Sequence, residues 1–294
     1  MFSYSDLHSI IQQNLWKIPR DIDLVIGIPR SGLMPASHIA TSLNLPLLTL
    51  NGETKKISTK QLFTLRELRD VEDLEHVLLV DDTSNTGLRM SQAVNLINER
   101  WGRIKITTLV TASALNESFM PDIAFLNSIA PRIFAWNMFN HDEITPRIAI
   151  DLDGILCVDP TQEQNDDGKN YKEFIRHAKL KIKPAKQVKA IITGRLEKYR
   201  SETEDWLSEN SILYHELFMN DAASSSYRRT EKFEIGNLVV DQISEFKSRI
   251  LSTLNPPLFV ESNLDQALNI HEITGLNTYA FDHDRFFGLE NFET

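Results

Sequence analysis

The segment Val77–Gly87 reads VLLVDDTSNTG, and this stretch decides the fold of the first half of the chain. Four apolar residues are followed by two aspartates and then by a short loop of hydroxyl and amide side chains that ends in glycine. A helical pattern begins at about Leu88. A continuous apolar run beside a helix is typical of a strand that is covered on both faces of a parallel sheet. We therefore expect an α/β fold built on parallel strands.

The same design recurs along the whole chain. A short apolar run ends at the turn Gly27–Gly32, and similar runs end at Asp151, Thr193 and Glu261. Each run precedes a segment with helical periodicity, which is the pattern of strands alternating with helices in one parallel sheet. The sequence thus predicts two α/β domains, each with a parallel sheet.

A polar stretch near the middle of the chain suggests where the two domains meet. Residues 140–146 are mostly polar and end in a proline, and a new apolar strand begins directly after them. We expect one domain over residues 1–143 and a second over residues 144–294. Each is about 150 residues long, which is enough to bury a separate core.

Composition and charge exclude several classes of protein. The 294 residues include 31 Lys and Arg against 41 Asp and Glu, so the formal charge is −10. That balance disfavours DNA binding, which depends on neutralising phosphates. The single cysteine, Cys157, excludes a disulfide framework and a cysteine-built zinc site, and it suits a reducing compartment. No apolar run approaches the ~20 residues of a membrane span, and the N-terminus lacks a signal-peptide pattern. We expect a cytoplasmic protein without membrane contact.

The two turns of the first half carry groups that suit a phosphorylated sugar. The loop Thr83–Gly87 enters a helix, and backbone N–H groups at such a point favour a phosphate. The carboxylates of Asp81 and Asp82 can accept hydrogen bonds from a vicinal diol. Arg30 adds a cation for a second anionic group. Taken alone, the Asp-Asp-Thr stretch is also compatible with acids that cap a helix.

With both turns in this order, residues 1–140 resemble the type I phosphoribosyltransferases, and Val77–Gly87 resembles most of their thirteen-residue motif for phosphoribosyl diphosphate. The resemblance implies binding of phosphoribosyl diphosphate, with Mg²⁺ bridging diphosphate and ribose oxygens, and a nucleobase-like acceptor, with a purine favoured. It implies that Asp81 and Asp82 hold the ribose hydroxyls. The remaining predicted ligands are Thr83, Ser84, Asn85, Thr86 and Gly87 for the 5-phosphate and Arg30, Ser31 and Gly32 for the pyrophosphate.

Two further segments of this half have alternative interpretations. Leu50–Ile57 falls where the family has a mobile loop, so Lys55 or Lys56 could close over the diphosphate, or the segment is a solvated hairpin. Ile133–Asn137 resembles the base-binding segment of xanthine/guanine-type transferases. There Phe134 and Trp136 would stack on the base, or they are core residues.

A second group of acids follows the strand that begins at Arg147. Asp151 and Asp153 are two residues apart, so they project to the same side if the strand pattern continues. One carboxylate can attack phosphorus while the other protonates the leaving oxygen, with a cation screening their repulsion. Thr193, Lys247 and Glu261 follow or flank later predicted strands.

Together these segments resemble the four motifs of the haloacid dehalogenase superfamily over residues 147–294. The resemblance implies a phosphatase that acts on a phosphomonoester, with Asp151 as nucleophile and Asp153 as general acid and base. Thr193 and Lys247 would bind the phosphoryl oxygens, and Asp151, Asp153 through its carbonyl, and Glu261 would hold Mg²⁺. Glu261 departs from the usual aspartate, and Lys232 is a rival for the role of Lys247. Residues 165–168 are either a flap over the site or a turn, with the turn favoured.

The whole sequence therefore suggests a bifunctional enzyme. A phosphoribosyltransferase would form a nucleotide, and a Mg²⁺-dependent phosphatase would then remove its 5-phosphate. Two alternatives stay open: the first domain senses phosphoribosyl diphosphate without catalysis, or it serves as a lid for the phosphatase. The oligomeric state, including a homodimer, is also left open.

Overall fold

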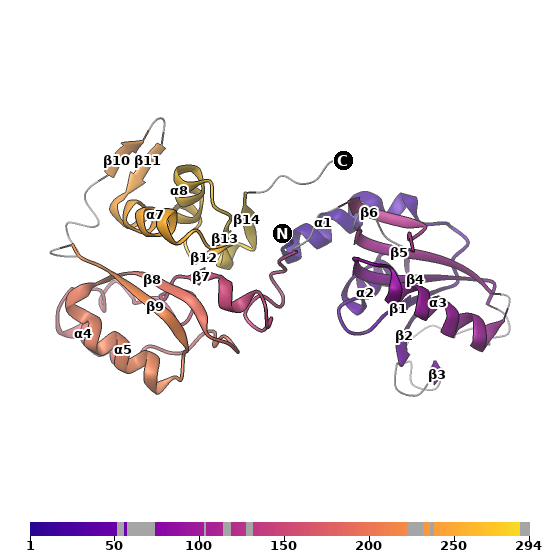
Figure 1. Ribbon diagram of the computed structural model, residues 1–294, viewed down its shortest axis with the longest axis horizontal. Coiled ribbons are helices and arrows are strands. Elements are labelled where there is room, and N and C mark those ends of the chain that lie inside the picture. The colour runs from indigo at the N-terminus through magenta and orange to yellow at the C-terminus, as the bar shows by residue number, and fades with distance from the viewer. Residues whose placement is uncertain are drawn as a thin grey trace. The chain divides into compact units, whose positions relative to one another are not determined.

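The computed structural model describes residues 1–51, 56–57, 74–102, 104–113, 119–127, 132–222, 232–235 and 238–288. They form two compact units (Figure 1). The N-terminal unit comprises Tyr4–Arg132, and the C-terminal unit comprises Met1–Ser3 together with Ile133–Leu289. Each unit has its own six-stranded sheet, and the predicted α/β class with parallel sheets is confirmed.

The sheet of the N-terminal unit has the strand order β3-β2-β1-β4-β5-β6. All neighbouring strands are parallel except β2 and β3, which are antiparallel. The strands are β1 (Leu24–Gly27), β2 (Leu47–Asn51), β3 (Lys56–Ile57), β4 (His76–Ser84), β5 (Lys105–Ser113) and β6 (Ile123–Asn127). Strand β1 and the first part of β4, Val77–Val80, are apolar and fully buried, as burial on both faces requires.

Helices cover both faces of this sheet. Leu24 and Ile26 of β1 pack with Met90 of α3 (Leu88–Trp101) on one face. The other face contacts α2 (Leu33–Leu43), against which α1 (Tyr4–Asn14) lies, followed by the short helix η1 (Leu15–Lys17). Strand β4 continues through both aspartates to Ser84 and pairs with β5 along this extension. The acids therefore belong to the strand rather than to the loop after it.

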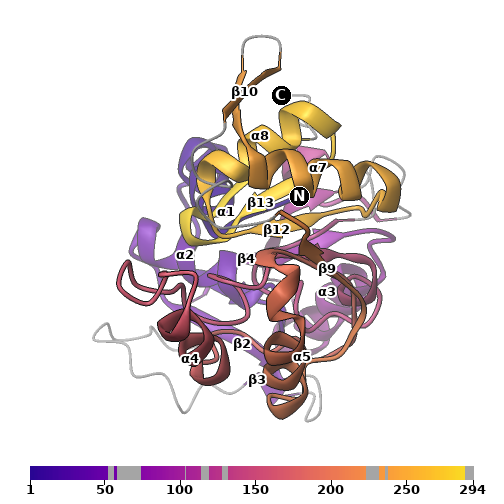
Figure 2. The same cartoon turned by 90° about the vertical axis from the view of Figure 1, so that its left-hand side faces the viewer.

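The sheet of the C-terminal unit has the order β14-β13-β12-β7-β8-β9, with β14 antiparallel to the parallel remainder. Its strands are β7 (Ala149–Ile150), β8 (Val188–Leu196), β9 (Tyr214–Asn220), β12 (Phe259–Glu261), β13 (Thr278–Ala280) and β14 (Arg285–Phe287). Its helices are α4 (Lys169–His177), α5 (Arg200–Glu209), α7 (Gln242–Leu254) and α8 (Leu264–Thr274), with the short helices η3 (Thr145–Arg147), η4 (Glu197–Tyr199) and η5 (Phe281–His283). An antiparallel hairpin of β10 (Lys232–Ile235) and β11 (Leu238–Asp241) precedes α7 (Figure 2).

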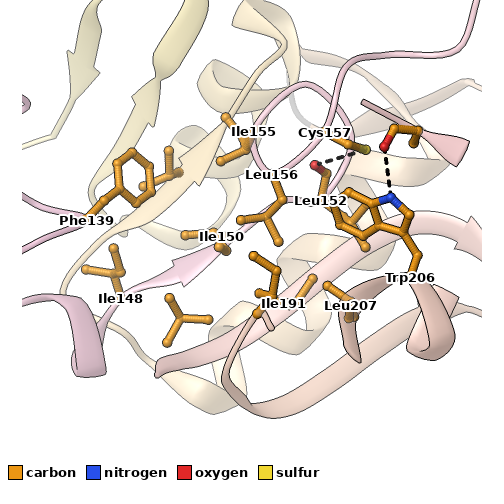
Figure 3. Packing of buried hydrophobic residues seen from close by; sticks show 14 of the residues in the cluster. Phe139, Ile148, Ile150, Leu152, Ile155, Leu156, Cys157, Ile191, Trp206 and Leu207 are labelled. Carbon is orange, nitrogen blue, oxygen red and sulfur yellow. Dashed lines mark hydrogen bonds between the residues drawn. The ribbon is translucent and has the colours of Figure 1, made fainter. Parts of the chain in front are cut away.

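Alternating side chains divide the core of this unit into two layers. Ile150 and Ile191 face α4 and α5, where Trp206 packs with them (Figure 3). Their strand neighbours Ala149 and Ile192 face α7 and α8 instead. In Figure 3 Leu152 lies inside the first layer, so it anchors the segment that carries the aspartates on either side of it.

The two compact units divide between Arg132 and Ile133, whereas the sequence predicts a boundary between residues 143 and 144. The reason lies at the chain's beginning. The Phe2 N–H donates to the Ile133 carbonyl, and the Ala135 N–H donates to the Phe2 carbonyl, both at 2.9 Å. Ile133, Ala135, Met138, Phe139 and Ile144 then enter the core of the C-terminal unit. A pairing between segments that are far apart in the chain does not change the local pattern of polar residues, so the sequence does not reveal this boundary.

Candidate functional sites

A cavity of about 380 Å³ opens at the carboxyl end of the central strands of the C-terminal unit. Its floor contains the predicted residues Asp151, Asp153, Thr193, Lys247 and Glu261. These residues come from β7, β8, α7 and β12 and the segments that follow them, and they span more than a hundred positions of the chain. The structure thus brings together every residue that the sequence predicts for this site.

Lys247 is the centre of the floor. Its ammonium lies 2.9 Å from Asp151 Oδ2 and 2.6 Å from Glu261 Oε2. The lysine is 1% exposed, and Glu261 is 1% exposed as well. Burial and then the Glu261 carboxylate raise the pKa of Asp151 well above its usual value, against the opposing effect of Lys247. Two buried carboxylates thus share one cation.

Asp153 is held by a different cation. The Arg195 guanidinium donates to both oxygens of its carboxylate, from Nε at 3.0 Å and from Nη2 at 2.7 Å. Arg195 is buried, and its Nη2 also lies 3.4 Å from the Cys157 sulfur. The carboxylate of Asp153 raises the pKa of Arg195 although burial opposes this. The sequence pattern does not single out Arg195 as a site residue. Its position directly after Thr193-Gly194 is the signal that could have identified it.

Thr193 is fully buried and lines the same cavity. Its Oγ1 accepts a hydrogen bond from the Arg195 N–H at 3.2 Å, which leaves the hydroxyl proton able to donate. Nearby, Gly154 has φ +77°, and an added Cβ would collide with the Ser262 side chain. The turn after Asp153 therefore passes close to the strand end that carries Glu261.

The polar groups of the floor can be tested as a magnesium site. Asp151, Glu261 and the carbonyl of Asp153 supply hard oxygen ligands, which Mg²⁺ prefers. Two carboxylates surround the single ammonium of Lys247, and this net negative charge also favours binding of a metal cation. Within the described ranges, no three His, Cys, Asp or Glu side chains are grouped to hold a metal. The residues therefore suit Mg²⁺ with two carboxylate side chains and one backbone carbonyl as ligands. The Asp153 carboxylate is not one of them, because it is bound by Arg195.

Residues 165–168 form a turn, which is the interpretation that the sequence favours. The Asp166 carboxylate accepts hydrogen bonds from the N–H groups of Gly168, Asn170 and Tyr171 at 2.9 to 3.3 Å. These bonds lower the pKa of Asp166. Asn165 lies next to this turn and lines the cavity. The turn therefore fixes the start of α4 beside the site.

The predicted residues of the N-terminal unit lie on the turn after β1 and on the end of β4 with the loop that follows it, and these two segments touch each other. A Cβ added to Gly32 would lie 2.6 Å from Asp81 Oδ1, so only glycine allows this approach. The Arg89 guanidinium donates to the Pro29 carbonyl at 2.6 Å and ties the first turn to the start of α3. The Pro29–Arg30 peptide bond is cis. Arg30 is exposed and Ser31 is half-buried, so both side chains can reach a ligand.

Asp81 and Asp82 are buried, at 3% and 7% exposure. Each carboxylate accepts a hydrogen bond from the next backbone N–H: Asp81 from Asp82, and Asp82 from Thr83. Burial, and then the charge of Asp82, raise the pKa of Asp81 to about 8, with Arg89 opposing. A carboxyl group with this pKa retains a proton at neutral pH and still offers an oxygen that accepts hydrogen bonds.

The loop after these acids has a defined shape. Gly87 has φ +71°, and an added Cβ would collide with the backbone of Phe119. The Gly87 N–H donates to Ser84 Oγ at 3.0 Å. Arg132 donates to Asn85 Oδ1 at 2.9 Å and to the Ser84 carbonyl at 3.0 Å. Thr83 is half-buried, whereas Asn85 and Thr86 are exposed at the start of α3.

The comparisons with known proteins decide the family of this half. The family model described as phosphoribosyl transferase domain matches residues 3–138. Residues 3–138 form a type I phosphoribosyltransferase domain. The match includes both turns described above, and the sheet order places them on the neighbouring strands β1 and β4.

Curated relatives of the phosphoribosyltransferase domain are archaeal. An orotate phosphoribosyltransferase of Sulfurisphaera tokodaii is 33% identical over 90 residues, which are 31% of this chain and 44% of that protein. One of Staphylothermus marinus is 31% identical over 105 residues, which are 35% of this chain and 49% of that protein. The chain thus spans about half the length of the curated relatives that it matches.

Two solved structures also match part of this chain. A purine phosphoribosyltransferase of Pyrococcus horikoshii matches with a TM-score of 0.39 and 22% identity, over 48% of this chain and 96% of that one. The xanthine-guanine-hypoxanthine phosphoribosyltransferase of Helicobacter pylori matches with a TM-score of 0.36 and 15% identity, over 46% of this chain and 90% of that one.

The two aromatic residues predicted to bind a base lie past the end of the N-terminal unit. Phe134 stacks on Phe2 at 5.5 Å and on Trp136 at 4.7 Å between ring centroids. Phe134 and Trp136 are half-buried in the C-terminal unit, although the family model extends to residue 138. Lys55 and the side chains of Lys56 and Lys232 lie outside the described residues. None of the described helices is long and apolar enough to cross a bilayer.

Proposed function

We propose that the chain is a bifunctional enzyme. Its phosphoribosyltransferase domain transfers ribose 5-phosphate from phosphoribosyl diphosphate to a nucleobase, and its C-terminal unit is a Mg²⁺-dependent phosphatase. The observation that carries the second activity is the buried floor in which Lys247 binds both Asp151 and Glu261. The first activity rests on the family of residues 3–138.

In the transferase, the exposed loop at the start of α3 would bind the 5-phosphate. Asp81 and Asp82 would accept hydrogen bonds from the ribose hydroxyls. Bond cleavage at the anomeric carbon passes through an oxocarbenium-like state, so the departing pyrophosphate needs charge stabilisation. Arg30 beside Gly32 would supply it, together with Mg²⁺ bound to the substrate. The curated relatives are orotate phosphoribosyltransferases, which favours orotate as acceptor, whereas the sequence resemblance favours a purine.

In the phosphatase, Asp151 would attack phosphorus and the bond to the alcohol oxygen would break. Asp153, which pairs with Arg195 as a carboxylate here, would have to take up a proton before the substrate reacts; it would give that proton to the alcohol oxygen, and an aspartyl-phosphate would remain on Asp151. Asp153 would then take a proton from water, whose oxygen attacks phosphorus and releases Asp151 with inorganic phosphate. Thr193 and Lys247 would bind the phosphoryl oxygens. Arg195 would hold Asp153 in the orientation that both proton transfers need.

Magnesium would be held by Asp151, Glu261 and the Asp153 carbonyl. When bound, the ion would neutralise phosphoryl charge and screen the carboxylates from each other. Lys247 contributes a second, permanent cation, since its neighbouring carboxylates raise its pKa further. Together they would allow an anionic nucleophile to approach an anionic substrate.

The fusion suggests that the two reactions are consecutive. The transferase would make a nucleotide, and the phosphatase would remove its 5-phosphate to give a nucleoside. Hydrolysis of the ester would make the sequence effectively irreversible. Incubation of the full chain with phosphoribosyl diphosphate, Mg²⁺ and a base would then yield the nucleoside. Failure of the phosphatase on every ribonucleotide tried would contradict the coupling.

The transferase is tested with phosphoribosyl diphosphate, Mg²⁺ and a panel of orotate, uracil, adenine, guanine, hypoxanthine and xanthine. We expect pyrophosphate release that depends on one base and is lost in Asp82→Asn. Glu99→Gln, an exposed position on α3, is the matched control and should retain activity. Binding of phosphoribosyl diphosphate without pyrophosphate release for any base would instead favour a sensor domain.

The phosphatase is tested with p-nitrophenyl phosphate. We expect phosphate release that stops when EDTA removes Mg²⁺ and that falls by at least about a thousandfold in Asp151→Asn. Asp205→Asn, an exposed aspartate on α5, controls for the substitution itself. Equal activity of the Asp151→Asn variant and the parent would contradict the proposed nucleophile.

A further inference from the structure

We infer that the cavity of the C-terminal unit selects phosphomonoesters whose alcohol part is uncharged and rich in hydroxyls, and that it rejects those with a further anionic group. This inference rests on the proposed phosphatase function and adds the substrate class to it. The chemical class is a polyol or sugar monophosphate, which includes a nucleoside monophosphate.

The floor of the cavity has no cation to spare for a second anionic group. Lys247 is bound by Asp151 and Glu261, and Arg195 is bound by Asp153. Among the described residues that line the cavity, five carboxylates stand against these two cations. A single Mg²⁺ and one phosphoryl group would bring the floor close to neutrality. Any further anion must therefore lie toward the mouth.

Two acids stand at the mouth, Asp159 and Asp282, and both are exposed. Asp282 is compensated: its Oδ1 accepts from the Lys181 ammonium at 2.6 Å, and the same ammonium donates to the Gly154 carbonyl. Asp159 is different. Within the part of the chain that the structure describes, no hydrogen bond or ion pair engages its carboxylate, and Asp153 and the partial burial of Asp159 raise its pKa.

A carboxylate at the mouth without a hydrogen-bonding partner, with Lys181 as its nearby cation, discriminates by charge and by hydrogen bonding. It repels a second phosphate or a carboxylate of the substrate. Between partly exposed charges this repulsion weakens substrate affinity by about tenfold. It attracts hydroxyl groups, because a carboxylate only accepts hydrogen bonds. His283 also lines the cavity and offers a further polar group. A cavity of about 380 Å³ is at the small end of ligand sites, so a single sugar fits best.

The test uses two substrates that differ only in charge. Sorbitol 6-phosphate and 6-phosphogluconate share a six-carbon chain, and one ends in a hydroxymethyl group where the other ends in a carboxylate. With the full chain and Mg²⁺, we expect kcat/KM to favour sorbitol 6-phosphate by at least about tenfold. Raising the salt from about 0.05 M to about 0.5 M should reduce this ratio. p-Nitrophenyl phosphate reports whether hydrolysis occurs at all.

Asp159 is the residue that should set the ratio. Asp159→Asn should lower the ratio of the two kcat/KM values by at least about threefold. Asp159→Lys should remove the preference for sorbitol 6-phosphate or reverse it. Asp205→Asn, the control on α5, should leave the ratio as in the parent. Equal kcat/KM for the two substrates, or a ratio unchanged in Asp159→Lys, would overturn the inference while the phosphatase stands. Absence of phosphate release from all three substrates would overturn the phosphatase itself, and the inference with it.

Discussion

The guanidinium of Arg195 makes three hydrogen bonds of 2.7 to 3.2 Å to the carboxylate of Asp153. Asp153 follows β7, Arg195 lies in β8, and these two strands are neighbours in the sheet. The Arg195 side chain is completely buried and that of Asp153 is 18% exposed. Two residues that are 42 positions apart are thereby held as one rigid ion pair at the cavity floor.

Breaking this pair should be costly. Arg195→Met leaves the Asp153 carboxylate without its main partner, so we expect the free energy of unfolding to fall by about 3 kcal/mol or more. In the double variant Arg195→Met with Asp153→Leu, the loss should be smaller than the sum of the two single losses. Chemical denaturation of the four proteins measures this coupling. Strict additivity would show that the pair is energetically irrelevant.

Removing the cation shared by Asp151 and Glu261 should have an effect of similar size. Lys247→Met leaves two buried carboxylates facing each other, and we expect a loss of about 3 to 5 kcal/mol. Adding Glu261→Gln should restore part of it. Lys186→Met is the surface control, since Lys186 pairs with the exposed Asp142, and it should change stability by less than about 0.5 kcal/mol. Denaturant unfolding measures all three, and a loss in Lys247→Met no larger than the control's would contradict the buried network.

Asp81 should make stability fall with rising pH. Its pKa is raised to about 8 in the folded protein, so the contribution of its protonated form is complete below about pH 4 and is lost as the pH rises through 8. Asp81→Asn does not titrate. The Tm of Asp81→Asn minus the Tm of the parent should therefore increase by several degrees between pH 5 and pH 9.

Asp166→Asn controls for this pH dependence. Its pKa is lowered by backbone N–H donors, so its stabilising effect is lost only as the pH falls below the usual aspartate range. The Tm difference between Asp166→Asn and the parent should stay constant between pH 5 and pH 9. A constant difference for Asp81→Asn as well would show that Asp81 is ionised throughout.

Alanine substitutions at Gly87 and Gly275 distinguish the cost of backbone strain from the cost of a steric collision. Their backbone angles are nearly equal, φ +71° and ψ −2° against φ +69° and ψ 3°. An added Cβ at Gly87 meets Phe119, whereas at Gly275 nothing lies within 4 Å. Gly275→Ala should cost about 1 kcal/mol from the positive φ alone. Gly87→Ala should cost more and should also weaken phosphoribosyl diphosphate binding, as calorimetry would show. Equal stability losses would exclude the collision.

Much of each site could be predicted from the sequence because its residues follow apolar strand segments. Asp81, Asp151, Thr193 and Glu261 all lie at or directly after such segments, and parallel strands bring those ends to one edge of a sheet. Gly87 was marked by its place between a strand and a helix. Arg195 also follows an apolar strand segment, but its partner Asp153 could not be predicted, and Asp159 had no such signal, since both roles depend on which side chains lie across from them.

The sequence by itself determined the two parallel α/β sheets, the order of strands and helices along the chain, and the acids that close each strand. These follow from local hydrophobic patterns, which act over a few residues. Tertiary structure alone decided that Lys247 joins Asp151 to Glu261, that Arg195 holds Asp153, and that Phe2 carries the chain's first residues into the C-terminal unit. Those contacts depend on how segments that are far apart in the chain pack together, and local sequence patterns do not predict this packing.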